Sequence, residues 1–498
     1  MRIIAAILLA LSMPTRADAF CGFYVGGAGT KMFNNATQVV LMRHGQTTVL
    51  SMQNNYQGPP SRFAMVVPVP VVLKEQNVKT LPRDVFDKID TLGAPRLVEY
   101  WEADPCNPRP QLDFTSRSGS VELDSVETTS ESSDEEEYKV KIEARFSVGE
   151  YDIVVLSAGE STGLERWLRK NEYAIPDGVA PLLRPYIEQG MKFFVAKVDP
   201  KKVRFENGMA TLSPLRFHYD TPEFALPIRL GLANSNGAQD LIVNILAPAL
   251  RYEVANYPNI TIPTNLTLKP SAKDRFAEFY VSLFDHAVGQ VPNAVVTEYA
   301  WDSGSCDPCP GPTLDANDLA TFGADVVSQT YKDTSPYGMT LTRLHARYGK
   351  EVKNDLVFRA VQPIGGGRGT PDPNGWLDTK VTNEGSNNFQ GRYSIMHPWT
   401  GAVACDNPQR GLWGGPPGGE QQLAKPGTNL AFAPRGKVEL ATLLEKSPPK
   451  VGPMESTAER LPIPIRQPQG CGCETASGAS AGAFALLLGF VLRRRRRA

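Results

Sequence analysis

The sequence predicts an α+β fold, made mainly of antiparallel sheet with a few packed helices and followed by a loop-rich C-terminal extension. Segments rich in β-branched and apolar residues follow one another without the regular alternation of strand and helix that a doubly wound sheet requires. Hydrophobic residues make up 41% of the 498 residues and aromatic residues 9%. A chain of this composition can bury a core, so we expect one large or two medium-sized globular domains.

The first elements are strands. They are expected at 37–52 and 63–72, on either side of the turn signal Gln57-Gly-Pro-Pro60. After Pro82 the pattern becomes helical as far as about Leu92, and residues 94–102 complete this first segment.

An acidic, serine-rich stretch follows at about 117–137. It is too polar to contribute to a core, so a solvated loop is expected. A calcium site is the alternative, but the acidic residues lack the alternating ligand spacing and the fixed glycine of an EF-hand loop.

Strands and helices then mix as far as residue 301. Strands are expected at 140–148, 151–158, 191–198, 215–220, 224–230, 241–246, 251–256 and 295–301, and helices at 161–171, at 179–189 and from about 271. The five strands between 191 and 256 are separated by short turns, which predicts an antiparallel meander. In the last helix Phe276, Tyr280, Leu283, Phe284 and Ala287 recur at helical spacing, so one face should pack on that sheet.

The composition of the sequence changes after about Gly365. Glycine and proline clusters predict an extension with little regular structure at 362–440, and prolines punctuate a charged stretch at 441–469 that suits a semi-extended stalk. The glycine cluster at 365–369 is a turn-rich loop rather than a phosphate loop, because the Lys-Ser/Thr ending is missing.

The N-terminus is typical of a cleaved signal peptide. Arg2, an apolar run at 3–11 and Ala17-Asp-Ala19 supply its basic, apolar and small-residue parts, which predicts a signal peptide at 1–19 and a mature chain from Phe20. Phe20 precedes Cys21, whereas a lipoprotein signal needs a small residue there, so no lipidation is expected at this end.

The C-terminus carries a second predicted targeting signal. Cys471-Gly-Cys473 precedes an apolar stretch at 481–492 and the arginines at 493–497, at the end of a segment that spans 470–498. The apolar stretch is short for a transmembrane helix, and the arginines favour the cytoplasmic side, which places the body across the membrane. The segment resembles the MYXO-CTERM sorting signal of myxobacterial and related envelope proteins. This resemblance implies cleavage near the cysteines by a membrane protease, delivery to the outer membrane or cell surface, and a lipid on Cys471 or Cys473.

Charge and composition limit the partners. The formal net charge is −1, and the body becomes mildly acidic once the five terminal arginines are removed. No basic patch with interleaved aromatic residues occurs, so nucleic acid is not an expected partner. The expected partners are the membrane, through the tail, the export and tail-processing proteases, and an envelope ligand or protein whose chemistry the sequence does not identify. No cofactor is expected.

Five cysteines lie outside the sorting tail and fit an oxidising compartment: Cys21, Cys106, Cys306, Cys309 and Cys405. At most two disulfides can form among them, and their connectivity is open. For the pair Cys306-Asp-Pro-Cys309 a structural disulfide is the leading interpretation. A redox centre, a metal site and a free thiol pair are the alternatives, but no second close pair occurs and Pro310 obstructs a following helix.

The body resembles a known family in its motifs, among them Phe20-Cys-Gly22, Thr297-Glu-Tyr-Ala-Trp301 and Cys306-Asp-Pro-Cys309. Further matching segments are 39–42, 52–58, 63–69, 95–100, 104–106, 190–198 and 226–231. They are similar to an exported bacterial family catalogued as domain of unknown function twenty-three thirty, over about 20–361. The resemblance implies one continuous exported domain with the acidic stretch as an excursion, and it implies no activity.

One motif points toward an enzyme. Leu41-Met-Arg-His-Gly-Gln46 resembles the opening signature of the histidine phosphatase superfamily, in which the histidine accepts a phosphoryl group and the arginine stabilises its charge. The downstream His-Gly context is missing from the other histidines, which are His218, His286, His345 and His397. A hairpin turn at His44-Gly45 is therefore the leading interpretation. His345 lies between arginines that disfavour a bound cation, and a structural role is expected for it and for His218.

Two classes of function remain. The first is an exported cell-envelope protein, displayed at the surface as a non-catalytic binding or structural module. The second is an exported hydrolase of the histidine-phosphatase type that uses Arg43 and His44. No catalytic or metal-binding set is predicted, since the only Gly-x-Ser-x-Gly match, at 478–482, lies in the sorting tail and no helical histidine pair with a carboxylate occurs.

Overall fold

The computed structural model describes residues 23–25, 36–54, 64–107 and 138–456, and the last range has short gaps at 172, 174, 176–177, 200, 207–208, 235–236, 331–337, 368, 370, 372–373, 418–423, 429–434 and 437. All of the described residues belong to one compact unit, Met1–Leu461. The expected signal peptide at 1–19, Cys21, the acidic stretch at 117–137 and the sorting tail at 470–498, with Cys471 and Cys473, lie outside the described residues.

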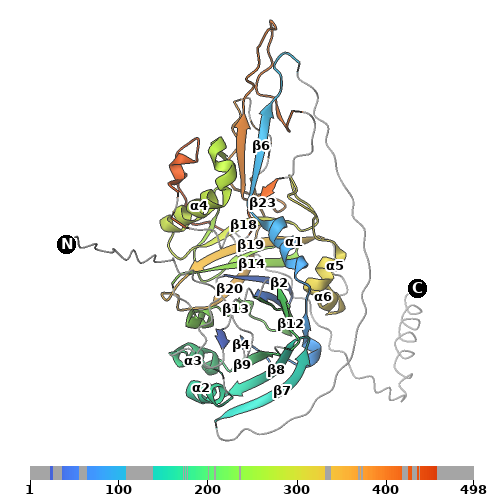
Figure 1. Cartoon of the computed structure of the whole chain (residues 1–498), viewed down its shortest axis with the longest axis vertical. Helices are drawn as coiled ribbons and strands as arrows, with labels where there is room; N and C mark the ends of the chain where they lie inside the picture. Colours follow the sequence, from blue (N-terminus) through green and yellow to red (C-terminus); the bar gives the residue numbers. More distant parts are fainter. Residues whose placement is uncertain are drawn as a thin grey trace, which may run out of the picture. The chain divides into compact units, whose positions relative to one another are not determined.

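The described residues form four layers, in which two helices, a smaller sheet, a larger sheet and a second set of helices follow one another (Figure 1). Strand β4 (Ala64–Val69) shows how the sequence produces them, because successive side chains of a strand point to opposite faces. Met65 and Val67 pack in the core between the two sheets, whereas Ala64 and Val66 pack against the helices on the outer side.

The smaller sheet has five strands, in the order β1-β4-β9-β8-β7. They are β1 (Phe23–Val25), β4, β9 (Lys192–Val198), β8 (Tyr151–Ala158) and β7 (Val140–Val148), and their outer face is covered by α2 (Ser161–Lys170) and α3 (Ala180–Glu188). All neighbours in this sheet pair antiparallel.

The larger sheet has 11 strands and crosses the centre of the molecule (Figure 1). Its members in order are β22 (Thr382–Asn383), β21 (Ile364–Gly366), β23 (Asn388–Gln390), β18 (Val295–Asp302), β19 (Met339–Tyr348), β14 (Gln239–Pro248), β2 (Ala36–His44), β3 (Thr47–Asn54), β12 (Leu215–Asp220) and β5 (Val78–Thr80), with β16 (Asn259–Thr261) beside β18. At its centre β2 pairs parallel with β14 and antiparallel with β3, so strands from distant parts of the chain are joined there.

Helices cover the outer face of the larger sheet. They are α1 (Asp84–Gly93), α4 (Phe276–Gln290), α5 (Ala316–Leu319) and α6 (Asp325–Thr330). Between α5 and α6 the chain approaches β3 closely at Gly323, whose φ is 135° and where a Cβ would lie 2.7 Å from Val49. Glycine is required there, because any side chain would both collide and strain the backbone.

Three smaller sheets complete the described structure. One contains β13 (Ala225–Leu226), β20 (Leu356–Val361) and β15 (Arg251–Val254), and a hairpin contains β10 (Arg204–Glu206) and β11 (Met209–Thr211). The third contains β17 (Leu266–Leu268), β24 (Arg392–His397), β6 (Arg96–Glu102), β25 (Trp413–Gly414) and β26 (Lys425–Pro426). In the third sheet β6 and β24 pair parallel, although they come from opposite ends of the chain.

The segment 438–456 packs along α4. The hydroxyl of Ser282 donates to the carbonyl of Val438 at 3.2 Å, and the amide of Met454 donates to the carbonyl of Asn259 at 2.7 Å. Leu443 and Leu444 are buried in the same apolar cluster as the helix. The residues 441–456 of the expected stalk are therefore held to the body, because their leucines have an apolar helix to cover.

The predicted α+β class is confirmed, and β7, β8 and β12 have the predicted bounds. The meander prediction is wrong, since β9, β12, β14 and β15 are not neighbours of one another but lie in three different sheets. The strand predicted at 224–230 is only β13, after which the chain forms a 3-10 helix at Arg229–Asn234. Pro227 has no N–H to donate to a ladder, which ends the strand.

None of the helices within the described ranges has both the length and the apolar character needed to cross a membrane.

Candidate functional site

The hairpin expected at His44-Gly45 is present, with His44 paired to Thr47 across the turn. Gly45 has a φ of 56°, in the left-handed region that favours glycine. Arg43 is 5% exposed, and its guanidinium donates to the carbonyls of Gln46 and Thr221, each at 2.9 Å. These bonds commit the guanidinium to the backbone, so the arrangement does not favour Arg43 as the anion-binding partner of a phosphohistidine.

Three further histidines, which are His218, His286 and His397, each have a hydrogen-bond partner. The ring of His218 lies 3.0 Å from the amide nitrogen of Asn77, and that of His286 lies 3.0 Å from the carbonyl of Pro449. His397 pairs with Glu99 at 2.8 Å. Among the described residues, no group of three or more His, Cys, Asp or Glu side chains is arranged to hold a metal ion.

Two disulfides form in the described part of the chain. Cys106 joins Cys405 across a sequence separation of 299, and Cys306 joins Cys309, with Cα–Cα distances of 5.5 Å and 4.9 Å. Both distances are ordinary for disulfides. The disulfide bonding expected from the sequence is thus confirmed, and Cys106–Cys405 ties the turn after β6 to the loop after β24.

A groove of about 650 Å³ opens where the smaller five-stranded sheet and the larger sheet meet the three-stranded sheet of β13, β20 and β15. Met191, Tyr219 and Pro227 supply apolar wall, and the loops after β15 and before β20 supply polar wall. A volume in this range suits a small ligand or a side chain of a partner.

Three charged side chains line the groove: Arg229 and Asp355, which pair with each other, and Glu223, which is exposed. Arg229 donates to Asp355 Oδ2 at 2.7 Å, and Asp355 Oδ1 accepts from the hydroxyl of Tyr186 at 2.7 Å and from the amide of Ile228 at 2.8 Å. The side chain of Asn256 also bonds this wall, since its amide donates to the carbonyl of Asp355 at 2.7 Å. The groove therefore has a fixed shape and presents a neutralised ion pair.

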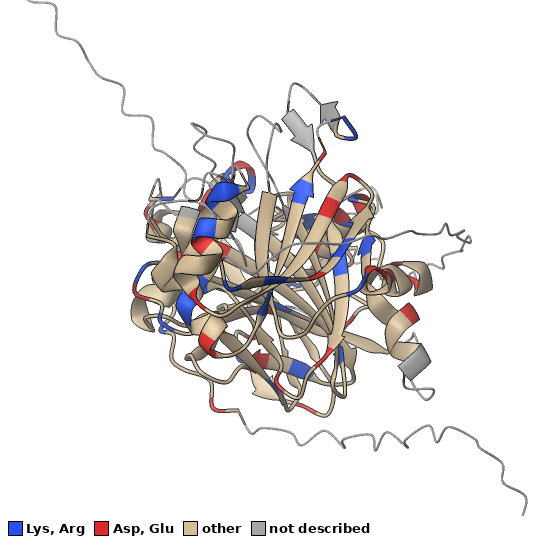
Figure 2. Cartoon of the chain, turned by 90° about the horizontal axis from the view of Figure 1, so that it is seen from below, with Lys and Arg blue, Asp and Glu red and all other residues tan. Residues whose placement is uncertain are grey.

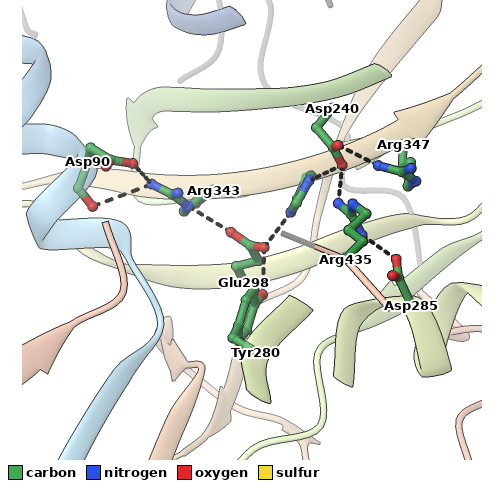
Figure 3. A network of polar contacts seen from close by, with 9 residues as sticks. Asp90, Asp240, Tyr280, Asp285, Glu298, Arg343, Arg347 and Arg435 are labelled. Carbon is green, nitrogen blue, oxygen red and sulfur yellow. Dashed lines mark hydrogen bonds and ion pairs between the residues drawn. The ribbon is translucent and has the colours of Figure 1, made fainter. Parts of the chain in front are cut away.

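A network of buried charges crosses the larger sheet between α1 and α4 (Figure 3). Arg343 on β19 donates to Asp90 of α1 at 2.6 Å and to Glu298 of β18 at 2.7 Å. The other oxygen of Glu298 accepts from the hydroxyl of Tyr280 on α4 at 2.5 Å. One chain of hydrogen bonds thus links both helices to the sheet.

His345 extends this network along β19. Its Nδ1 lies 2.8 Å from Glu298 and its Nε2 lies 3.0 Å from Asp240. Asp240 also accepts from Arg347 at 2.5 Å and from Arg435 at 2.6 Å, and Arg435 reaches on to Asp285 of α4. Four cationic side chains therefore meet four carboxylates, and the network is neutral as a whole.

The pKa directions follow from this pairing. Burial raises the pKa of Glu298, but the charges of His345 and Arg343 and the bond from Tyr280 outweigh it and lower the pKa to about 2. Burial lowers the pKa of His345, and attraction to Glu298 and Asp240 reverses this, so the pKa is raised. Both ring nitrogens face carboxylate oxygens, so both carry hydrogen and the ring is an imidazolium.

The centre of the network is buried, whereas Arg347 and Asp285 at its end are partly exposed. Glu298 is 0% exposed and His345 1%, and the ring of Phe284 stacks on His345 at 4.0 Å with Arg435 above it. Groups that exchange protons with a substrate must reach it, and these do not. The arrangement joins helices to the sheet, and the structural role expected for His345 agrees with it.

Sequence reasoning did not single out Glu298 or Asp240 as partners of His345. The available signal was the spacing Arg343-x-His345-x-Arg347, which places three cationic side chains on one face of a strand. Burial of three neighbouring cationic side chains is favoured by carboxylates from other strands or helices.

The family of the chain follows from a sequence comparison. A bacterial family described as "uncharacterized protein conserved in bacteria" (DUF2330) matches residues 15–359. The chain belongs to this family. The match covers the smaller sheet, most of the larger sheet, the groove and all of the charge network except Arg435. No curated protein and no solved structure matches the chain.

Proposed function

We propose that this DUF2330 member is an exported cell-envelope protein that binds a ligand or partner without transforming it. The observation that carries the proposal is the groove, whose arginine and aspartate neutralise one another and are held by Tyr186 and by backbone amides. A catalytic site needs titratable groups whose environments set them apart for proton transfer or attack. A fixed, mixed polar and apolar wall instead suits recognition.

Export is supported by the cysteines and by the sequence signals. Disulfides persist in oxidising compartments, and two are formed here. The proposed route is export through the signal at 1–19, transient residence of the tail in the inner membrane with its arginines cytoplasmic, and delivery to the outer membrane or cell surface.

The distribution of charge supports a partner other than nucleic acid. In the cartoon of Figure 2, positions of lysine and arginine and positions of aspartate and glutamate are interspersed along the helices and loops. A nucleic-acid interface needs a basic stripe.

The alternative is a hydrolase centred on Arg43 and His44. Nothing in the hairpin favours it, because Arg43 bonds the carbonyls of Gln46, Thr221 and Pro222 and the hydroxyl of Thr48.

The binding proposal is tested by photocrosslinking in intact cells. A photoreactive residue at Thr221, in the groove wall, should give a covalent product with an envelope component. The same residue at Ser147, an exposed position on β7, is the matched control. Equal products at both positions, or none at Thr221, would contradict the groove as binding site.

The export proposal is tested by intact mass measurement of protein from envelope fractions. We expect a mature chain that begins at Phe20 and lacks the five terminal arginines. Recovery of a chain that retains Arg493 to Arg497 would show a permanent anchor instead of a processed tail.

A further inference from the structure

Two buried arginines face each other on neighbouring strands of the β6–β24 sheet. Arg96 begins β6 and Arg392 begins β24, and the two are register partners in the parallel pair, so their side chains leave the same face. Arg96 is 0% exposed and Arg392 3%.

Neither arginine has an ion pair with a carboxylate among the described residues. Arg96 donates to the carbonyls of Leu92 at 2.5 Å and Pro308 at 3.0 Å, and its guanidinium lies 5.4 Å from the centre of the Tyr299 ring. Asp307, which is exposed, attracts it only at longer range. Within the described ranges the guanidinium of Arg392 donates one hydrogen bond, to the carbonyl of Gly369 at 3.5 Å, and lies 5.4 Å from the centre of the Tyr100 ring.

Other buried arginines of the chain show what is missing. Arg251 pairs with Glu253 at 3.3 Å and Arg343 with Glu298 at 2.7 Å, and both arginines are as deeply buried as Arg96. The guanidinium of Arg43 has four oxygens within 3.2 Å, from three carbonyls and one hydroxyl. Arg392 has neither arrangement.

Several donors at this place are unused. The Nε atoms of Arg96 and Arg392 have no hydrogen-bond partner in the described part of the chain. The same holds for the hydroxyl of Ser394, which is fully buried two residues beyond Arg392 on the same face of β24. Burial and the nearby charge of Arg96 lower the pKa of Arg392 to about 10, so the guanidinium still carries its charge at neutral pH.

Two buried like charges without a counterion are costly to the fold, and they are stabilised when an anion joins them. Guanidinium groups match oxyanions in particular, because their planar N–H groups can bond two oxygens at once. We propose that Arg96 and Arg392 form a binding site for a small oxyanion of the phosphate or sulfate class, with the hydroxyl of Ser394 as a third donor.

A disulfide and hydrogen bonds hold the residues around Arg96 and Arg392 in place. The carbonyl of Pro308, which Arg96 uses, lies inside the loop closed by Cys306–Cys309, and Gln390 donates to the carbonyls of Asp307 and Gly367. Gly367 has a φ of 70°, and a Cβ there would lie 1.9 Å from the carbonyl oxygen of Gln390. The chain can therefore approach Gln390 this closely only with glycine at this position.

The test uses the full chain, prepared in chloride buffer without phosphate or sulfate. Equilibrium dialysis with radiolabelled inorganic phosphate at constant ionic strength should show saturable binding of one phosphate per chain, displaced by sulfate and more weakly by acetate. Binding should weaken by at least about tenfold in Arg392→Met, which removes charge-assisted hydrogen bonds. It should be unchanged in Arg359→Met, the matched control, because Arg359 pairs with Glu253 at 2.8 Å.

A second variant keeps the test decisive if Arg392→Met does not fold. Arg392→Lys retains the charge but loses the planar fork, so binding should weaken by several-fold. Absence of saturable binding to the unsubstituted chain, or equal binding in Arg392→Lys and Arg392→Met, would overturn the proposal. Asp372 lies three residues after Gly369 and outside the described residues, so Asp372→Asn is included. Phosphate binding that appears only in Asp372→Asn would identify Asp372 as the counterion and would also overturn the proposal.

Discussion

Two clusters of buried charge meet on consecutive residues of β18, and the chain treats them differently. Glu298 belongs to the neutral network, in which each cation touches a carboxylate. The ring of Tyr299, the next residue, lies 5.4 Å from the guanidinium of Arg96, which belongs to the unpaired cluster. The charges of the neutral network stabilise the fold, because each cation has a carboxylate partner. The two arginines of the other cluster have no such partner among the described residues.

The largest effect is expected when the neutral network loses its central carboxylate. Glu298→Gln leaves Arg343 and His345 buried with one carboxylate partner each in place of two. Breaking a buried ion pair by removing one partner typically costs about 3–5 kcal/mol of unfolding free energy. Chemical denaturation of the purified chain measures this loss.

The matched variant in the other cluster is Arg392→Met. It removes a buried charge that has no carboxylate partner among the described residues, so in phosphate-free buffer we expect a cost below about 1.5 kcal/mol, or a gain. Equal losses in Glu298→Gln and Arg392→Met would remove the distinction between the two clusters.

The next effect concerns the disulfide that fastens the strand of Arg96. Replacing Cys106 and Cys405 by serine should cost about 2–4 kcal/mol, because the bond closes a very long loop. Hydrogen exchange should become faster in β6, which lies just before Cys106, and remain unchanged in β18. Equal loss of protection in both strands would show that the two clusters are not independent.

The pH dependence of stability should be governed in part by His345. Its folded pKa is raised, so its contribution is fully present below the ordinary value of 6.5 and is lost as pH rises through the folded pKa. The loss has a slope of at most about 1.4 kcal/mol per pH unit. His44 and His218 have lowered pKa values and act in the opposite direction.

The contribution of His345 is measured by comparing the unfolding free energy of the chain with that of His345→Gln between pH 6 and pH 9. Glutamine keeps a side chain able to hydrogen bond. We expect the decline toward alkaline pH to disappear in the variant. An unchanged decline would mean that His345 is neutral in the folded state.

The smallest effect is expected at the hairpin. His44→Ala should change the unfolding free energy by less than about 1 kcal/mol, because His44 is only half-buried at a turn. The neighbouring Arg43 donates to three carbonyls and one hydroxyl. A phosphomonoesterase activity of the purified chain that vanishes in His44→Ala would instead establish the hydrolase alternative.

The sequence was sufficient for elements whose information is local. The alternation in β7 and β8 and the apolar spacing in α4 depend on neighbours within a few residues. The bounds of both strands were predicted correctly, and the helix was predicted but begins at Phe276, after a 3-10 helix at Pro270–Arg275. The hairpin of β2 and β3 was also accessible, because its turn at His44-Gly45 is local. The pairing of β2 with β14 was not, because about two hundred residues separate the two strands. No sequence pattern within either strand indicates that the two strands pair.

The two charge clusters follow the same rule. The spacing of Arg343, His345 and Arg347 is visible in the sequence, but Glu298 and Asp240 arrive from other strands. Arg96 and Arg392 become neighbours only through the β6–β24 pair, so no local pattern marks them as a site.

The Cys106–Cys405 bond makes residues 106–405 a covalent ring. Under the proposed export, this ring could close only after Cys405 has crossed the membrane, and β2, β6, β14 and β19 would have crossed before it. The proposed export would therefore place oxidation after the central strands are available to pair. Once the ring is closed, a single cut anywhere within it leaves both pieces covalently joined, and they separate only after reduction.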